Sequence, residues 1–334
     1  MPKVSIITIN YNGIEDTIEC LKSLKKITYP NYDVFVVDNA SKNNEGERLK
    51  KKFGKYIHLI QSDKNLGFGG GNNLAFDYIF ENSNTKYVLL INNDMIVNPS
   101  FLNYLVESIE RNSNICSVSP QGLNYYNRDI VDGTGISYYK CGLSFAINKG
   151  FPKDSRIEGP FFSSGSGCVI YSIKSLVKLK KYHKEYFDSD FFMYSEDVDI
   201  GFRFIHLGYT HKYNLKSIIY HKGSRSSGID SDFSRYYSLR NNILTIYKNY
   251  PLYLLLKYFF PILIMQFAIF LLYIKRGKLK LFLRSYKDIL SMIPLMYKKR
   301  KLILKNSKIK NKDLIKSFET KIFPLKYFFY FNKK

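Results

Sequence analysis

The sequence predicts an α/β protein built on a mainly parallel sheet with helices on both faces. Three short apolar runs, at 4–9, 33–38 and 86–92, have the length and composition of buried strands. The segment at 14–24, between the first two runs, spaces its apolar residues as a helix does. Strands that alternate with helices favour a doubly wound parallel sheet.

The order of the other elements follows from the same periodicities. The helix over 14–24 carries acidic residues near its start and lysines near its end, as the helix dipole favours. A glycine-rich loop at 67–71 precedes another helix. The remaining expected elements are a Lys-rich helix after residue 38, a strand over 56–61, a helix over 72–81, two Tyr-rich strands near 130–147, a strand over 168–171, a helix to about 181, a helix over 196–207 and a strand over 216–220.

Polar residues end the predicted parallel strands. Asn10, Asp38 and Asp94 each follow an apolar run, and ligands bind at the carboxyl ends of strands in sheets of this kind. The carboxylate of Asp94, beside a short loop, suits a hard divalent cation that keeps positions open for phosphate oxygens. An Asx turn that closes the strand explains the same residue.

Three carboxylates, those of Glu196, Asp197 and Asp199, lie in the first turn of a predicted helix. Negative charge is stabilised there by the helix dipole, but capping needs one such residue rather than three. One of them is therefore a candidate general base. The alternative is a charge-rich helix start that forms a salt bridge to Arg203.

Three further signals are weak when taken singly. Glycines at 67–71 allow an anion or a ribose to approach the backbone, although their spacing fits neither a P-loop nor a dinucleotide fingerprint. His221 follows a predicted strand and is either a metal ligand or a structural histidine. Arg240 lies on a predicted helix and is either a diphosphate clamp or part of a basic surface.

The positive charge is concentrated near the C-terminus. The chain has a formal net charge of +23, and residues 251–334 hold 20 Lys and Arg against 3 Asp and Glu. A segment that is both basic and rich in Leu, Ile, Phe and Tyr indicates an anionic membrane surface rather than nucleic acid. We expect in-plane or re-entrant helices; a transmembrane hairpin within 251–297 and a soluble helical bundle are the alternatives.

Seven motifs occur in a fixed order over about residues 3–250. They are VSIITINYNG, VVDNAS, NLGFGGGNN, LLINND, SGSGCVIYS, EDVDIGFR and YYSLRNN. In this combination the chain resembles family 2 glycosyltransferases of the Rossmann-like GT-A fold, and most closely their rhamnosyltransferase-like branch. The resemblance implies a GT-A catalytic domain at 1–220, an active-site loop and helix at 221–250, and a helical, membrane-associated tail at 251–334.

On the donor side, the resemblance implies a nucleotide-sugar site with a divalent cation, Mg²⁺ or Mn²⁺. Asp94 ends a motif whose leading Asp is replaced here by Asn92, and it would bind the metal together with His221. The residues that would hold the nucleotide sugar are Tyr11, Asp38, Asn65, Gly67, Asn93 and Arg240.

On the acceptor side, Asp197 matches the catalytic base of the family, with Glu196 beside it. Ser164 and Gly165 would face the acceptor. The implied reaction is an inverting transfer from dTDP-rhamnose or a UDP-hexose to a glycan or polyprenyl-linked acceptor, in cell-surface polysaccharide or glycolipid synthesis. A catalytically inactive sugar-nucleotide-binding scaffold is the alternative. The N-terminus lacks a signal-peptide pattern, and the four cysteines lack zinc-site spacing. We therefore expect the protein at the cytoplasmic face of the cell membrane.

Overall fold

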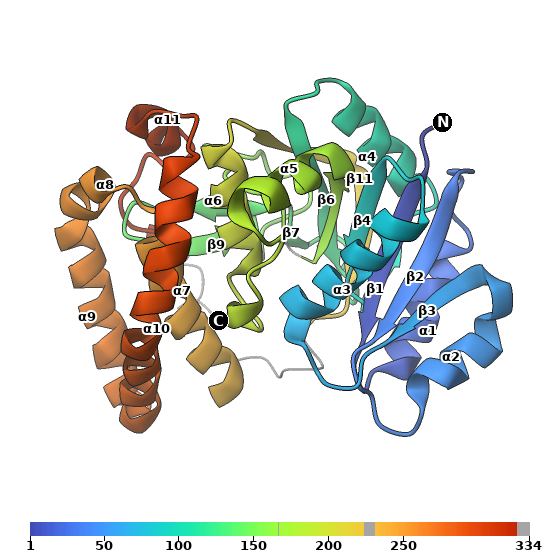
Figure 1. Ribbon diagram of the computed structural model, residues 1–334, viewed down its shortest axis with the longest axis horizontal. Coiled ribbons are helices and arrows are strands. Elements are labelled where there is room, and N and C mark those ends of the chain that lie inside the picture. The colour runs from blue at the N-terminus through green and yellow to red at the C-terminus, as the bar shows by residue number, and fades with distance from the viewer. Residues whose placement is uncertain (166, 224–230, 326–334) are drawn as a thin grey trace.

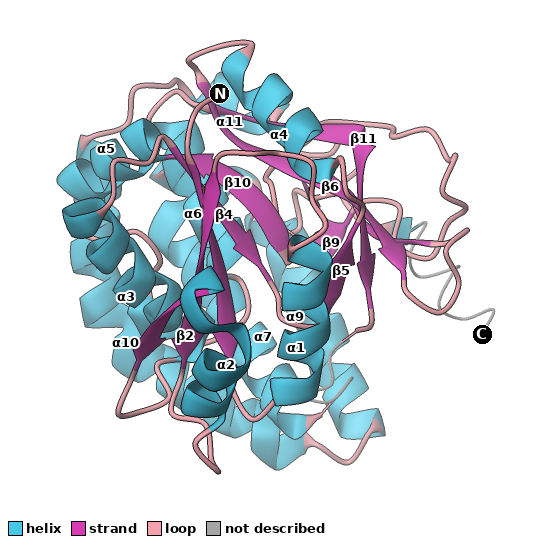
Figure 2. Ribbon diagram, turned by 90° about the vertical axis from the view of Figure 1, so that its right-hand side faces the viewer, coloured by secondary structure: helices cyan, strands magenta, loops and turns pink. Residues whose placement is uncertain are grey.

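The computed structural model of the protein describes residues 1–165, 167–223 and 231–325. Its centre is one large sheet with the strand order β3-β2-β1-β4-β10-β6-β11-β5, to which β7 adds by pairing with β6 (Figures 1 and 2). The strands are β1 (Val4–Asn10), β2 (Tyr32–Asp38), β3 (Ile57–Gln61), β4 (Tyr87–Ile91), β5 (Met95–Val97), β6 (Ile115–Asn124), β7 (Val131–Gly133), β10 (Cys168–Ser172) and β11 (Thr210–His221). A separate ribbon pairs β8 (Ile136–Tyr138) with β9 (Ser144–Ala146).

Helices cover both faces of the sheet. The α-helices of the described residues are α1 (Ile14–Leu24), α2 (Glu45–Phe53), α3 (Gly67–Asn82), α4 (Phe101–Glu110), α5 (Ile173–His183), α6 (Glu196–His206), α7 (Asp232–Asn249), α8 (Leu252–Lys257), α9 (Phe259–Lys275), α10 (Leu279–Lys305) and α11 (Asn311–Lys316). Side chains of a strand alternate between the faces, and in β4 Leu89 joins the core under α1, α2 and α4 while Leu90 joins the core under α3, α5 and α6. The predicted α/β architecture is confirmed.

The strand directions divide the sheet into two halves. Strands β1, β2, β3 and β4 are all parallel. Beyond β4 the sheet is mixed, because β10 runs antiparallel to both β4 and β6 while β11 runs parallel to β6. The sequence prediction of a mainly parallel sheet therefore describes the first half, where strand and helix alternate, and not the second.

Several elements differ from their predicted bounds. The glycine-rich segment is not a loop, because α3 begins at Gly67. A side chain at Gly67 would meet the backbone of Phe192, and one at Gly71 would press on Ile9, so these glycines permit close packing of a helix rather than a turn. The strand predicted over 216–220 begins earlier, at Thr210. The sequence reading missed β5, α4 and β6.

The C-terminal helices pack against the sheet domain. Helix α10 lies along α7 and also contacts α5 (Figure 1). Phe191 of the domain shares a hydrophobic cluster with Ile289 and Met296 of α10. Within the described ranges, no helix combines the length and apolar character needed to cross a bilayer. Parts of the predicted active-site loop (224–230) and of the predicted tail (326–334) lie outside the described residues, as does Ser166 of the predicted acceptor-side segment.

Candidate active site

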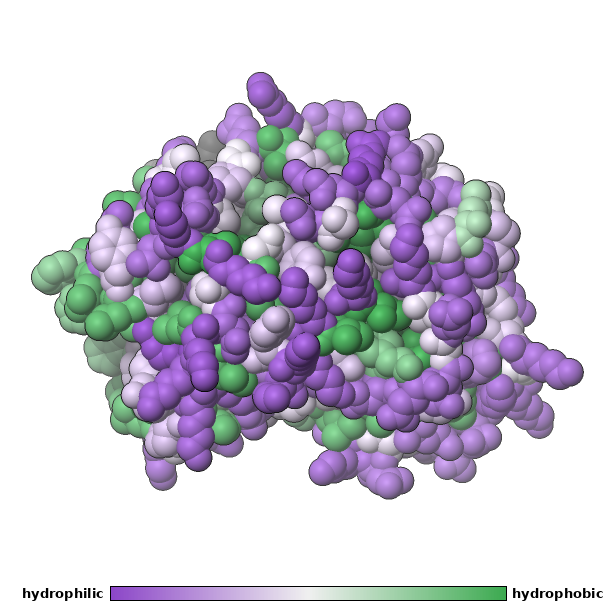
Figure 3. Space-filling view, turned by 45° about the horizontal axis from the view of Figure 1, so that its top comes forward, coloured by the Kyte–Doolittle hydropathy of each residue, from purple (hydrophilic) through white to green (hydrophobic). Residues whose placement is uncertain are grey.

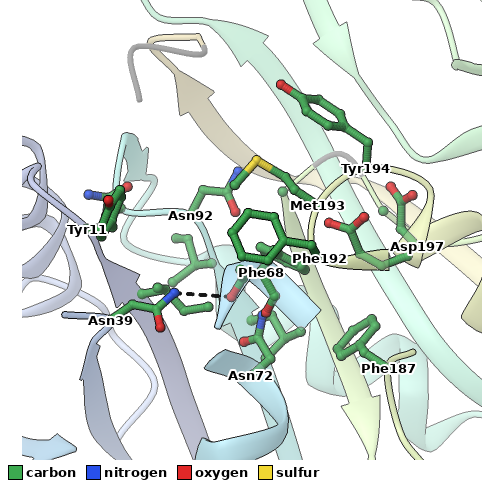
Figure 4. A pocket seen from close by; sticks show the side chains of 18 of the residues that line it. Tyr11, Asn39, Phe68, Asn72, Asn92, Phe187, Phe192, Met193, Tyr194 and Asp197 are labelled. Atoms are coloured by element: carbon green, nitrogen blue, oxygen red, sulfur yellow. Dashed lines mark hydrogen bonds between the residues drawn. The ribbon is translucent and has the colours of Figure 1, made fainter. Parts of the chain in front are cut away.

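A cavity of about 570 Å³ opens at the carboxyl ends of β1 and β4 (Figure 4). It brings together nine of the residues that the sequence marked, namely Tyr11, Asn65, Gly67, Asn93, Asp94, Gly165, Glu196, Asp197 and His221. Tyr11 and Asn39 lie on one side of the view in Figure 4, and Asp197 lies on the other. The cavity therefore lies where doubly wound sheets bind their ligands.

The metal candidates meet at one corner of this cavity. His221 pairs in register with Met95, the residue after Asp94, so the β5–β11 ladder brings both side chains to the same point. Asp94 Oδ2 lies 3.2 Å from His221 Nε2, and both side chains are largely buried. A carboxylate and an imidazole suit a divalent cation and leave its other positions to phosphate oxygens.

Asp132, on β7, was not marked by the sequence. Its Oδ2 lies 2.5 Å from His221 Nδ1, on the ring edge opposite Asp94. Burial opposes a charge on the imidazole, yet the hydrogen bonds to Asp132 and Asp94 raise the pKa of His221 to about 9. A carboxylate behind a ligating histidine fixes the ring orientation. No local pattern marks Asp132, because it comes from a three-residue strand 89 positions from His221.

Glu196 and Asp197 begin α6 at the edge of the cavity. Burial, followed by the neighbouring charge of Asp197, raises the pKa of Glu196 to about 8. Its Oε2 has no hydrogen-bond partner among the described residues. Asp197 Oδ1 accepts the N–H of Val198 at 2.9 Å. Gly165 approaches so closely that a Cβ there would lie 2.7 Å from Asp197 Oδ2.

Asp199 follows Asp197 by two residues in α6, but it lies in a different environment. It is fully buried and accepts hydrogen bonds from Arg203 Nε at 2.8 Å, Lys248 Nζ at 2.9 Å and Asn249 Nδ2 at 2.8 Å. Burial opposes its ionisation, but Lys248 and Arg203 hold the pKa of Asp199 below its usual range. The Arg203 salt bridge that the sequence left open is thus correct for Asp199, and Asp199 does not line the cavity.

Asp199 is part of a larger cluster of charges, which we call the ion network. Its members are Glu185, Asp188, Asp199, Arg203, Lys248 and Lys299. Lys248 Nζ and Lys299 Nζ each lie 2.5 Å from a carboxylate oxygen of Asp188. Because Lys299 is on α10, the network joins the C-terminal helices to the loop over 185–195, which forms one wall of the cavity.

That wall has an unusual backbone. Phe192, Tyr194 and Ser195 have φ values of 63°, 69° and 67°, in the left-handed region that non-glycine residues rarely adopt. Asn241 holds the segment, because its Nδ2 lies 2.8–2.9 Å from the carbonyl oxygens of Phe191, Met193 and Tyr194. Such strain persists where surrounding contacts over-determine it, and it clusters at functional sites.

Three residues expected to contact the donor or the acceptor do not line the cavity. Asp38 is buried and accepts a hydrogen bond from Asn10 Nδ2 at 3.0 Å. Ser164 is buried with its Oγ 3.3 Å from the carbonyl oxygen of Lys212. Arg240 donates to the carbonyl oxygens of Asp190 and Phe191 at 2.9 and 3.0 Å, so its guanidinium supports the wall. The ligand contacts expected of these residues stay predictions.

The neighbour of Asp38 is closer to the cavity. Asn39 Nδ2 donates to Asn65 Oδ1 at 3.0 Å and to the carbonyl oxygen of Gly67 at 3.2 Å, and Asn39 Oδ1 accepts the N–H of Leu66 (Figure 4). It therefore ties the end of β2 to the start of α3. Asn39 belongs to the motif VVDNAS, of which the sequence prediction singles out Asp38.

Comparison with known proteins supports the same family. Residues 5–165 match the sequence profile described as "Glycosyl transferase family 2". The chain is similar to the "Low-salt glycan biosynthesis hexosyltransferase Agl10" of Haloferax volcanii, with 25% identity over 248 residues that cover 72% of this chain and 74% of that protein.

Two solved structures share the fold. Residues 1–349 of S. aureus TarS align with a TM-score of 0.56 and 18% identity, over 91% of this chain and 88% of that one. The mannosyltransferase PcManGT from Pyrobaculum calidifontis, in complex with GDP-Man and Mn²⁺, aligns with a TM-score of 0.52 and 13% identity, over 95% and 86%. Residues 5–165 therefore carry a glycosyl transferase family 2 domain, and the ordered motifs and the GT-A architecture agree with that match.

Proposed function

We propose that the protein is a metal-dependent, inverting glycosyltransferase that uses a nucleotide-diphosphate sugar. One observation carries this proposal: the Asp94–His221 pair and the carboxylates of Glu196 and Asp197 line the same cavity of about 570 Å³. A cavity of this size, with a few polar groups that converge on it, suits a small-molecule substrate.

On the donor side, Asp94 and His221 are the residues that would hold Mg²⁺ or Mn²⁺. When bound, such a cation stabilises the negative charge that develops on a leaving diphosphate. Asn65 and Gly67 are fixed by Asn39, and with Tyr11 they offer the nucleotide a preformed surface. Preformed contacts reduce the entropy that binding costs.

On the acceptor side, Asp197 is the proposed general base. Its carboxylate takes the proton of an acceptor hydroxyl while that oxygen attacks the anomeric carbon of the donor. The bond from the anomeric carbon to the diphosphate oxygen breaks in the same displacement, and the nucleoside diphosphate leaves. A single displacement inverts the anomeric configuration. Gly165 leaves room beside Asp197, since any side chain there would meet its carboxylate.

The proposal also covers the identities of the donor and the acceptor. We propose dTDP-rhamnose or a UDP-hexose as donor, and a glycan or lipid-linked acceptor in cell-surface polysaccharide or glycolipid synthesis. The hexosyltransferase name of the Haloferax relative supports a hexose donor. The GDP-Man complex of the Pyrobaculum structure adds GDP-mannose to the donors that a test should include.

The test is release of nucleoside diphosphate by the purified protein from dTDP-rhamnose, UDP-glucose, UDP-galactose and GDP-mannose, with Mn²⁺, Mg²⁺ or a chelator. We expect one donor to be hydrolysed or transferred only when the metal is present. A donor that stabilises the protein against heat but is never turned over would support the inactive scaffold instead. Absence of both stabilisation and turnover would overturn the proposed function.

The metal assignment is tested with Asp94→Ala and a matched control, Asp129→Ala, whose carboxylate is exposed and paired with Lys153 outside the cavity. Thermal unfolding is measured with UDP or dTDP, with and without Mn²⁺. We expect the metal-dependent stabilisation to vanish in Asp94→Ala and to persist in the control. If both variants keep it, Asp94 only closes a turn.

A further inference from the structure

Helices α8 and α9 expose a continuous apolar surface. We call it the apolar face and define it by Leu256, Phe260, Leu263, Ile264, Phe267 and Leu271. These positions recur every three or four residues, so they lie along one side of the helical segment. Phe260 is 71% exposed and Phe267 is 59% exposed. An exposed apolar area of this kind on a soluble surface marks a site that another apolar surface covers.

The other side of α9 is already occupied. Met265 is buried in a cluster with Tyr139 and Cys141 of the catalytic domain. Tyr273 is buried against Leu239 of α7, and its hydroxyl donates to the carbonyl oxygen of Arg235 at 3.0 Å. These contacts fix the rotation of α9 about its own axis. The apolar face is therefore held outward, and α9 cannot bury it by turning.

Cations border the apolar face. Lys257 precedes α9, Lys275 is its last residue, and Arg276 and Lys280 follow it; all four are exposed. No charged residue occurs between 258 and 274. Figure 3 shows the same arrangement, with apolar side chains gathered at the left edge, where α8 and α9 lie in Figure 1, and hydrophilic side chains beside them.

We propose that the apolar face docks the protein on the surface of an anionic lipid bilayer. Apolar side chains would enter the boundary between headgroups and acyl chains, while the bordering lysines and arginines contact anionic headgroups. A second copy of the chain is a poorer occupant, because face-to-face pairing would bring two sets of like charges together. The proposal concerns a surface distinct from the cavity and does not rest on the proposed function.

The experiment is co-sedimentation of the full chain with vesicles of phosphatidylcholine, or of equimolar phosphatidylcholine and phosphatidylglycerol. We expect binding to the anionic vesicles that weakens in high salt and that is much weaker with the neutral ones. The double variant Phe260→Asp, Phe267→Asp should bind anionic vesicles at least about tenfold more weakly. Both substitutions are at exposed positions, so the variant should fold, which its thermal unfolding checks.

The matched control is Val177→Asp, a half-exposed apolar position on α5 away from the apolar face. It adds one negative charge, against two in the double variant, and should leave vesicle binding unchanged. Equal binding by the double variant and the wild-type protein would overturn the proposal. So would a dimer, seen by light scattering without lipid, that the double variant dissociates.

Discussion

The first turn of α6 presents acidic residues to two different environments. Glu196 borders the cavity, and burial raises its pKa to about 8. Asp199 is more deeply buried, yet its pKa is lowered, because Lys248 and Arg203 outweigh the cost of burial. Burial alone thus does not decide the ionisation of a carboxylate; the paired cations do. The comparison teaches that a carboxylate buried with cations stays charged, while a carboxylate buried without them favours its protonated form.

The two environments also differ in what they connect. The cavity is lined by residues of β4, β11 and α6, and a substrate in it would bridge these three elements. The ion network joins α6 to α7 and α10, and it anchors the loop that forms the cavity wall. Arg203 adds to this by donating to the carbonyl oxygens of Glu185 and Tyr186. The network therefore positions the wall although none of its members lines the cavity.

The largest effect is expected on the cavity side. Asp197→Asn keeps the size of the side chain but cannot take a proton. Turnover should fall by roughly 10²–10⁴, the usual contribution of a positioned general base. Thermal stability and the affinity for UDP or dTDP should stay close to those of the wild-type protein. Steady-state kinetics together with thermal unfolding measure both quantities. Wild-type turnover in this variant would show that another carboxylate is the general base.

The same substitution two residues further on should act on stability. Asp199→Asn removes the anion that Lys248 and Arg203 share in the interior, and breaking such a buried pair costs about 3–5 kcal/mol. Urea unfolding of the two Asn variants side by side provides the measurement. If Asp199→Asn instead lost turnover and kept its stability, Asp199 would act on the reaction in the cavity and not on the fold.

A smaller effect is expected where the network reaches α10. Lys299→Met preserves the aliphatic stem but removes the cation beside Asp188, which still retains Lys248. We expect a loss of about 1–3 kcal/mol, the usual cost of leaving a buried acceptor short of a partner. Lys298→Met is the matched control, because Lys298 is exposed on the same helix. Equal unfolding midpoints for the two variants would show that Lys299 does not couple α10 to the sheet domain.

The features that can be predicted from the sequence are those that a run of neighbouring residues encodes. The alternation of strands and helices up to β4 follows from runs of neighbouring residues, and Asp94 could be found because it ends one of those strands. The pairing of Asp199 with Lys248 and Asn249 could not be predicted, because these partners lie 49 and 50 positions away along the chain. The link between His221 and Asp132 has the same long-range origin.

Glycine-rich segments show a second limit. Glycine is a weak helix former, so the residues at 67–71 are predicted to form a loop. In the structure they begin α3, where a Cβ at Gly67 would collide with the backbone of Phe192 and one at Gly71 would press on Ile9. Tertiary packing overrode local propensity. The same packing brings the strained wall over the cavity, which no periodicity in the sequence indicates.

The smallest expected effect concerns the pH dependence of stability. The pKa of Glu196 is about 8 in the folded protein, against an ordinary value of 4.5. Between these values the folded chain keeps a proton that the unfolded chain has lost, so the stability that Glu196 contributes falls as the pH rises through this window. Glu196→Gln cannot ionise, and its unfolding should lack this part of the pH dependence.

The measurement is the urea midpoint of both proteins at about pH 5 and about pH 8, where linkage predicts the largest contrast. Glu196→Gln should gain stability relative to the wild-type protein at the higher pH, on the order of 1 kcal/mol, because a cavity that admits water reduces the cost of burying the charge. Groups that titrate elsewhere cancel in the difference between the two proteins. Parallel pH profiles would mean that the Glu196 carboxyl ionises normally, and that the contrast with Asp199 lies in hydrogen bonding and not in charge.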